Sequence, residues 1–188
     1  VIALAVGTAE IRAEYQGVTA KCILTVENEV EISFKKRSFD TVGGEYLDLG
    51  ITTLVNGKET DVELDIDVSE KGASVEKTEK GYFLKIDQGF SGVLNVSARY
   101  EETEAGCIIN VFRAVRTPFD FLAISNDLNG KYMLKNDIDF SGIDYKTIAH
   151  YDNSSSGKTG FSGILDGNGY ALKNIDITPS APYKNSTA

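Results

Sequence analysis

The sequence predicts an all-β protein built from more than one unit, and three observations support this fold class. Residues 62–68, VELDIDV, alternate apolar and acidic side chains, which is the period-two pattern of a β-strand with one buried face. Two stretches that lie 85 residues apart resemble each other along their whole length. Residues 166–169, DGNG, form a turn cluster between two short apolar runs. At 188 residues the chain is long enough for one large β domain or two smaller ones.

The two similar stretches are residues 7–26, GTAEIRAEYQGVTAKCILTV, and residues 92–111, GVLNVSARYEETEAGCIINV, which align without gaps. Identities at alternate positions predict, in each stretch, two strands with the same inward face joined by a short turn. They include the pairs Gly7/Gly92, Ala13/Ala98, Tyr15/Tyr100, Ala20/Ala105, Cys22/Cys107 and Val26/Val111. We therefore expect residues 1–26 to be the terminal strands of a truncated module, residues 27–113 a complete module and residues 114–188 a different domain, all within a longer polypeptide.

Residues 27–113 contain a series of short alternating segments with turn signals between them. Strands are expected at 30–34, 47–51, 62–68, 82–86, 94–100 and 107–111, with a further short one near 74–76. Asn56–Gly57 is a two-residue hairpin signal between the second and third of these strands. This spacing favours an immunoglobulin-like β-sandwich. The pattern G-T-A-x-I-x-A-x-Y-x-G-V-T-A-x-C-x-L-T-V in residues 7–26 resembles the closing strands of group 2 bacterial immunoglobulin-like domains.

The periodicity changes at Thr117. Residues 117–120, TPFD, combine an N-cap threonine, a proline at the first helical position and an acid at N3, which predicts a short helix to about Asn126. Asn129–Gly130 is a turn signal, and residues 131–140, KYMLKNDIDF, are expected to form a strand with Tyr132 and Leu134 on one face.

The motifs GKYxLxNDIDFSG and FSGxLDGNG in residues 130–169, together with that helix, resemble the N-terminal cap and first coils of right-handed parallel β-helix domains of bacterial surface proteins that carry GLUG-type repeats. The resemblance implies the first coils of a β-helix with a short capping helix after the sandwich. Only two or three coils fit in the remaining chain. We expect the last apolar layer, formed by Leu165, Leu172, Ile175 and Ile177, to be partly open to solvent.

Both cysteines are expected to be buried, reduced thiols. Cys22 and Cys107 occupy equivalent positions of adjacent modules and alternate with apolar neighbours, so each should point into its own core. Equivalent points on two such modules lie far beyond the roughly 7 Å between Cα atoms that a disulfide allows.

Residues 137–144 resemble the first half of a calcium-binding loop. Asp137 and Asp139 stand at its first and third positions, Ser141 provides an oxygen at the fifth and Asp144 lies close behind, but Ile148 occupies the twelfth, where a bidentate glutamate belongs. The four oxygen-bearing residues are calcium candidates, and the alternative is a turn at the edge of a coil. The sequence predicts no other metal site and no other cofactor.

Several other functions are not supported by the sequence. A net charge of −9, with a single basic cluster at residues 35–37, argues against nucleic acid as a partner. No apolar run approaches the roughly 18 residues of a membrane helix, so no membrane insertion is expected. No acid/base pair stands out among 28 acids, and the lone His150 has no cysteine or serine partner at a familiar spacing. Exposed tyrosines such as Tyr145, Tyr151 and Tyr170 could stack on sugars, although packing is the more common role.

The resemblances imply a non-catalytic, extracellular segment of a bacterial cell-surface or secreted multi-domain protein with a role in adhesion or display. Its partners would be a host or cell-surface protein or a polysaccharide, and the oligomeric state is left open. The alternative is the non-catalytic portion of a polysaccharide-degrading β-helix enzyme, either a lyase or a glycoside hydrolase. A spacer without a ligand is a third hypothesis.

Overall fold

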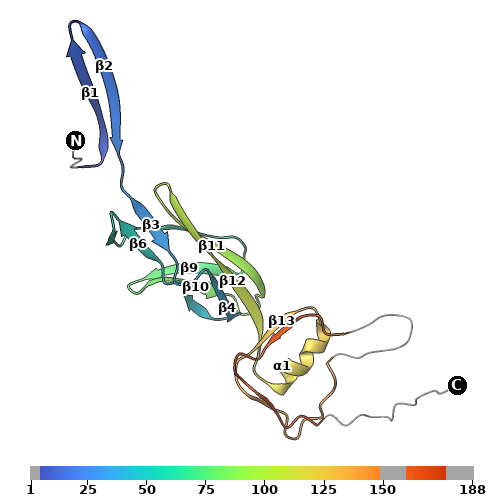
Figure 1. The fold of residues 1–188 in the computed structure, drawn as a ribbon. Helices are drawn as coiled ribbons and strands as arrows, with labels where there is room; N and C mark the ends of the chain where they lie inside the picture. Colours follow the sequence, from blue (N-terminus) through green and yellow to red (C-terminus); the bar gives the residue numbers. More distant parts are fainter. Residues whose placement is uncertain (1–4, 149–159, 177–188) are drawn as a thin grey trace, which may run out of the picture.

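The computed structural model describes residues 5–148 and 160–176, which form an all-β architecture in three parts (Figure 1). An isolated hairpin comes first, a β-sandwich follows, and a smaller unit with short parallel strands ends the described chain. Within the described residues, no helix is long and apolar enough to cross a membrane.

The first part is the antiparallel hairpin of β1 (Gly7–Tyr15) and β2 (Val18–Val26). Its two-residue turn places Gln16 and Gly17 at φ angles of 48° and 81°, the left-handed conformation that a tight hairpin turn requires. All hairpin residues are exposed except Val26, which is partly buried. The hairpin therefore stands clear of the other described elements (Figure 1).

The sandwich contains three sheets that enclose one apolar core. The first sheet has the order β3–β6–β7, the second β5–β10–β9, and the third places β8, β11 and β12 side by side with β4 paired to β12. The core comprises Phe39, Leu49, Leu64, Tyr82, Leu84, Ile86, Leu94, Val96, Ala98, Cys107, Ile109 and Val111. The strands are β3 (Val30–Ser33), β4 (Ser38–Val42), β5 (Tyr46–Asp48), β6 (Thr52–Val55), β7 (Lys58–Glu59), β8 (Asp65–Val68), β9 (Ala73–Thr78), β10 (Gly81–Ile86), β11 (Gly92–Tyr100) and β12 (Thr103–Val115).

The strand expected at residues 62–68 is shorter in the structure. Only Asp65–Val68 pairs as β8, although Leu64 is buried as its alternation predicts. The backbone N–H of Leu64 donates instead to the hydroxyl oxygen of Tyr82 at 3.0 Å, and that hydroxyl donates to the carbonyl oxygen of Val62 at 3.5 Å. A side chain therefore satisfies backbone groups that a longer strand would have paired. The Asn56–Gly57 turn forms as predicted, but it joins β6 to the short β7.

Strand β12 is longer than expected and joins the sandwich to the last unit. It pairs antiparallel with β11, parallel with β4 and, through residues 113–115, parallel with β13 (Lys131–Leu134). The expected boundary between residues 113 and 114 therefore falls inside a continuous strand.

The last unit begins with the helix that the sequence predicts. α1 (Pro118–Leu122) starts at Thr117 with both hydrogen bonds of a capping box to Asp120, and the 3-10 helix η1 (Ala123–Asn126) continues it. β13 pairs parallel with β15 (Ile164–Asp166), and β14 (Ile138–Asp139) pairs parallel with β16 (Leu172–Lys173). The core of the unit comprises Val115, Phe121, Ile124, Tyr132, Leu134, Ile138 and Phe140, with Leu165, Leu172 and Ile175 partly buried against it. Ile177 lies outside the described residues.

Strand β13 is buried on both faces, whereas the sequence indicated one apolar face. Tyr132 and Leu134 enter the core of the last unit as predicted. Met133 points the other way and packs with Val42 and Phe112 of the sandwich in a small separate cluster. The second face is buried because β13 lies against the end of β12, a contact between segments that sequence periodicity alone does not reveal.

The two cysteines differ in their environment. Cys107 is buried in the sandwich core as predicted, and burial raises the pKa of its thiol to about 11. Cys22 is exposed, so the prediction of a buried thiol was wrong for this residue. The reason is that no other described element covers the β1–β2 hairpin. Both thiols are free.

Candidate functional site

The junction between the sandwich and the last unit contains a cluster of charged and polar side chains. The Nζ of Lys135, which follows β13, lies 2.5 Å from Oε1 of Glu45 in the β4–β5 connection. The hydroxyl of Thr41 donates to the other carboxylate oxygen of Glu45 at 2.7 Å. Burial by itself would raise the pKa of Glu45, but these two hydrogen bonds and the positive charges of Lys135 and Arg116 lower it. Glu45 is therefore ionised, and its ion pair with Lys135 links the two units.

Arg113 provides a second connection across the junction. Its guanidinium lies 2.7 Å from the carboxylate of Asp127, donates to the hydroxyl oxygen of Tyr132 at 3.3 Å and stacks over the Tyr132 ring at 5.8 Å from the centroid. Its Nε also donates to Ser91 of the sandwich at 3.3 Å. One side chain on the shared strand β12 thus contacts both units.

An open groove of about 950 Å³ lies beside these contacts. Its charged lining is mixed, because Lys85, Arg113 and Arg116 share it with Glu45 and Asp87. Glu45 and Arg113 are already paired within the protein. The groove therefore has no strong preference for a ligand of either charge.

The structure places the calcium candidates at the contact between β14 and β16. The Oδ1 of Asp139 accepts from the backbone N–H of Ser141 at 2.9 Å, from the Ser141 hydroxyl at 2.8 Å and from the Asn174 side-chain amide at 2.7 Å. The Asn174 donor comes first among the causes that lower the pKa of Asp139 to about 2. Asp139 and Ser141 are thus brought together, but as acceptors for N–H and O–H donors.

The other two candidates do not share these hydrogen bonds. Asp137 forms an ion pair with Lys173 at 2.6 Å and accepts the backbone N–H of Ala171 at 2.9 Å, and these contacts lower its pKa. Asp144 is exposed. Calcium takes six to eight oxygen ligands, and no group of three or more His, Cys, Asp or Glu side chains in the described chain has an arrangement that could hold a metal ion. The geometry is that of a polar cross-link between two parallel strands.

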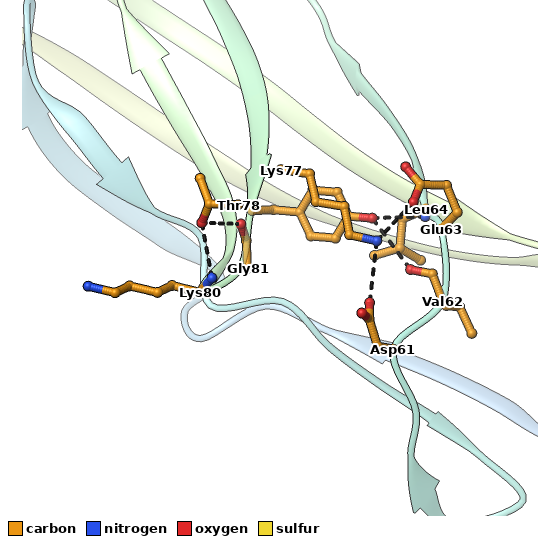
Figure 2. Close-up of polar contacts among 9 residues, drawn as sticks. Asp61, Val62, Glu63, Leu64, Lys77, Thr78, Lys80 and Gly81 are labelled. Carbon is orange, nitrogen blue, oxygen red and sulfur yellow. Dashed lines mark hydrogen bonds and ion pairs between the residues drawn. The ribbon is translucent and has the colours of Figure 1, made fainter.

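A further polar cluster surrounds Lys77 on β9 (Figure 2). Its Nζ lies 2.8 Å from a carboxylate oxygen of Glu63 and 3.3 Å from one of Asp61, and it sits 5.3 Å from the centroid of the Tyr82 ring. The hydrogen bond to Glu63 is the first cause that raises the pKa of Lys77. A lysine held in its charged form is a poor nucleophile. The role of the cluster is structural, because the two ion pairs attach Asp61 and Glu63, in the segment before β8, to β9.

The remaining residues singled out by sequence take structural places or lie outside the described chain. Tyr145 is partly buried and packs edge-to-face on Phe140 with ring centroids 5.6 Å apart, so it is a packing residue. Tyr170 is exposed. His150 and Tyr151 lie outside the described residues.

Sequence reasoning missed two features that hold the last unit in place. The Glu45–Lys135 pair joins residues 90 positions apart and leaves no local signal. A Cβ on Gly163 would overlap the carbonyl oxygen of Gly130, the acceptor of the Ile164 N–H at 3.0 Å. The FSG motif at residues 161–163 did contain a signal for this close approach, because glycine is the residue that permits it.

No protein-family model and no curated protein matches the chain. Solved structures with partial similarity include domains 4 and 5 of the S-layer protein SbsC, at 18% identity over 56% of this chain and 58% of that one, with a TM-score of 0.39. A structure of SbsC domains 4–9 matches at 18% identity over 57% of this chain and 18% of that one, with a TM-score of 0.40. A titin M10–obscurin-like 1 Ig complex matches at 16% identity over 44% of this chain and 93% of that one, with a TM-score of 0.27. The chain thus spans less than two thirds of each of these SbsC structures.

Proposed function

We propose that this chain is a rigid, non-catalytic segment of a bacterial cell-surface protein, in which an immunoglobulin-like sandwich supports the first coils of a right-handed β-helix for adhesion or display. The observation that carries the proposal is the shared strand β12, which pairs with β4 and β11 in the sandwich and with β13 in the last unit. A backbone that hydrogen-bonds into both units transmits force and orientation better than a flexible linker does.

The side chains at the junction support the same role. Val42 and Phe112 of the sandwich bury Met133 of the last unit, and the Glu45–Lys135 ion pair lies beside this cluster. Lys135 is only 24% exposed, so this pair is less screened by water than the surface pairs elsewhere in the described chain. Apolar contact, ion pair and shared strand together oppose bending between the two units.

The parallel pairing of the last unit supports the β-helix part of the proposal. β12, β13 and β15 are parallel neighbours, and β14 and β16 form a second parallel pair. Two sets of short parallel strands that recur along the chain are the elements of a coil wound around one core.

Distance measurements between two spin labels test the rigid connection. Labels at Ser74→Cys on β9 and Asn126→Cys in η1, in a Cys22→Ser background, report on the angle between the units, and the buried Cys107 stays unlabelled. We expect one narrow distance distribution that broadens in Lys135→Ala, while Lys80→Ala, an exposed lysine far from the junction, leaves it unchanged. A broad distribution in the unaltered junction would contradict a rigid support.

The proposal extends to location and partner, namely the outside of a bacterial cell and a host or cell-surface protein or polysaccharide. Binding of the pure chain to immobilised polysaccharides and surface proteins, without release of sugar ends, is the expected behaviour. Reproducible release of reducing or unsaturated sugar ends, abolished by one Asp substitution, would favour the polysaccharide-degrading alternative.

A further inference from the structure

The β1–β2 and β11–β12 hairpins have the same strand register. The Cα partners run from Gly7↔Val26 to Tyr15↔Val18 in the first and from Gly92↔Val111 to Tyr100↔Thr103 in the second. Every pair in one hairpin corresponds to a pair in the other at a shift of 85 residues. Because side chains alternate between faces, equivalent residues point to equivalent sides of the two hairpins.

One side of β11–β12 is core, and the equivalent side of β1–β2 is bare. The core side carries Leu94, Val96, Ala98, Cys107, Ile109 and Val111, each at most 4% exposed. Their equivalents are Ala9, Ile11, Ala13, Cys22, Leu24 and Val26. Ile11 is 46% exposed and Leu24 37%.

The opposite side of the first hairpin is polar and needs no cover. Glu10 and Lys21 form an ion pair there at 3.0 Å, with Arg12 and Glu14 nearby on the same side. Ile23 is the exception, but its equivalent Ile108 is also exposed in the complete sandwich. The hairpin is therefore amphipathic in the same sense as β11–β12, and only its apolar face lacks a partner among the described residues.

The complete sandwich shows what covers such a face. Leu49, Leu64, Leu84 and Ile86 lie in one core cluster with the inward residues of β11 and β12. Leu84 and Ile86 belong to β10 and Leu49 directly follows β5, whereas Leu64 precedes β8 of the other sheet. A two-stranded hairpin is at best marginally stable alone in water, so an apolar face of this kind calls for a second sheet.

We propose that the apolar face of β1–β2 is the docking surface for a β-sheet with an aliphatic inner face like that of β5–β10–β9, and that the two complete a second immunoglobulin-like sandwich. A second copy of this hairpin is a poorer occupant. The inner face of the equivalent hairpin β11–β12 packs in one core with the sheet β5–β10–β9 and not with a hairpin of its own kind. The sandwich of a second copy is already closed by its own β11–β12.

A chimera of the full chain provides the test. A copy of residues 27–91 replaces residues 1–6, because Ser91 leads into Gly92 as Val6 leads into Gly7. The copied segment contains no cysteine, so the reaction of Cys22 with Ellman's reagent reports on the hairpin face, with Cys107 as the buried internal reference. We expect Cys22 to react freely in the unaltered chain and roughly tenfold or more slowly in the chimera.

Two adjacent substitutions in the chimera provide a matched control. Leu24→Asp places a charge on the apolar face and should restore the reactivity of Cys22, whereas Ile23→Asp lies on the outer face and should leave the protection intact. Leu84→Asp in the copied segment tests the same contact from the other sheet.

Unchanged Cys22 reactivity in the chimera overturns the proposal. Protection of Cys22 in the unaltered chain that rises with protein concentration would instead identify a second copy as the occupant and also overturn it.

Discussion

The hairpins β1–β2 and β11–β12 share one pattern in two environments. Their first turn residues, Gln16 and Glu101, adopt nearly the same φ angles of 48° and 52° although neither is glycine. Yet Cys107 is buried while Cys22 is exposed. The comparison teaches that turn and register follow from the local sequence, whereas burial depends on whether a second sheet is present.

The largest expected effect comes from removing an inward side chain in each hairpin. Ile109→Ala should lower the free energy of unfolding by about 2–5 kcal/mol, because Ile109 is fully buried and leaves a cavity. Its equivalent Leu24→Ala should change it by less than about 0.5 kcal/mol. Urea unfolding followed by circular dichroism and tyrosine fluorescence measures both. A similar loss in the two variants would mean that the first hairpin packs on the rest of the chain.

The two thiols should differ in their effect at alkaline pH. The pKa of Cys107 is raised from 9.0 to about 11 in the folded protein, so the unfolded chain releases this proton first. The contribution of the protonated Cys107 thiol to the free energy of unfolding is complete below pH 9 and is lost as the pH rises from 9 to 11. The loss in the free energy of unfolding is on the order of 2–3 kcal/mol. Cys107→Ala should flatten this part of the stability profile, and Cys22→Ala should not. An unchanged alkaline loss in Cys107→Ala would contradict the assignment.

In the last unit, unlike in the two hairpins, glycine allows two backbone segments to lie close together, at Gly163 and Gly130. Gly163→Ala should destabilise this unit by about 1–3 kcal/mol, since the added methyl group overlaps the Gly130 carbonyl. Gly160→Ala, where nothing lies within 4 Å, is the matched control. Hydrogen exchange should accelerate at the Ile164 amide and stay unchanged in β11. Equal exchange in both variants would show that the approach is not tight.

Acid should loosen the β14–β16 contact. The pKa of Asp139 is lowered from 3.8 to about 2. The ionised carboxylate therefore contributes to the free energy of unfolding above pH 3.8, and this contribution is lost as the pH falls towards 2. Asp139→Asn should remove this acid dependence, whereas Asp144→Asn should keep it. Unfolding midpoints measured between pH 4 and pH 2 test the difference, and identical profiles would argue against the Asn174 and Ser141 hydrogen bonds.

Calcium should have the smallest effect, because the candidate carboxylates already accept internal hydrogen bonds. A calcium site would add about 2.7 kcal/mol to the free energy of unfolding when the calcium concentration is 100 times the dissociation constant. We expect no shift of the melting temperature in millimolar calcium. A rise of several degrees that disappears in Asp137→Ala would establish a calcium site.

Much of the secondary structure could be predicted from the sequence because its causes are local. Alternation located the strands around residues 82–86, 94–100 and 107–111, Asn56–Gly57 formed its turn, and Thr117 and Asp120 formed the capping box. The internal repeat predicted two hairpins with the same inward face, and their registers agree. Each of these depends on backbone conformation and side-chain spacing over a few residues.

The candidate site could not be predicted in the same way, because its partners are distant in sequence. Glu45 contacts Lys135 and Met133 packs with Val42 across the junction of two units that are far apart in the sequence. The acids at residues 137 and 139 had the spacing of calcium ligands, yet Lys173 of β16 and Asn174, the residue after it, contact them.

By itself, the sequence determined the strands around residues 82–86, 94–100 and 107–111, the turn at Asn56–Gly57 and the apolar face that the two hairpins share. Only the tertiary structure decided which apolar faces are covered, how far β12 extends and which charges pair. The physical reason is one of range. Steric limits and hydrogen bonds within a turn act between neighbours in the chain, whereas burial and ion pairing depend on which other segments arrive in space.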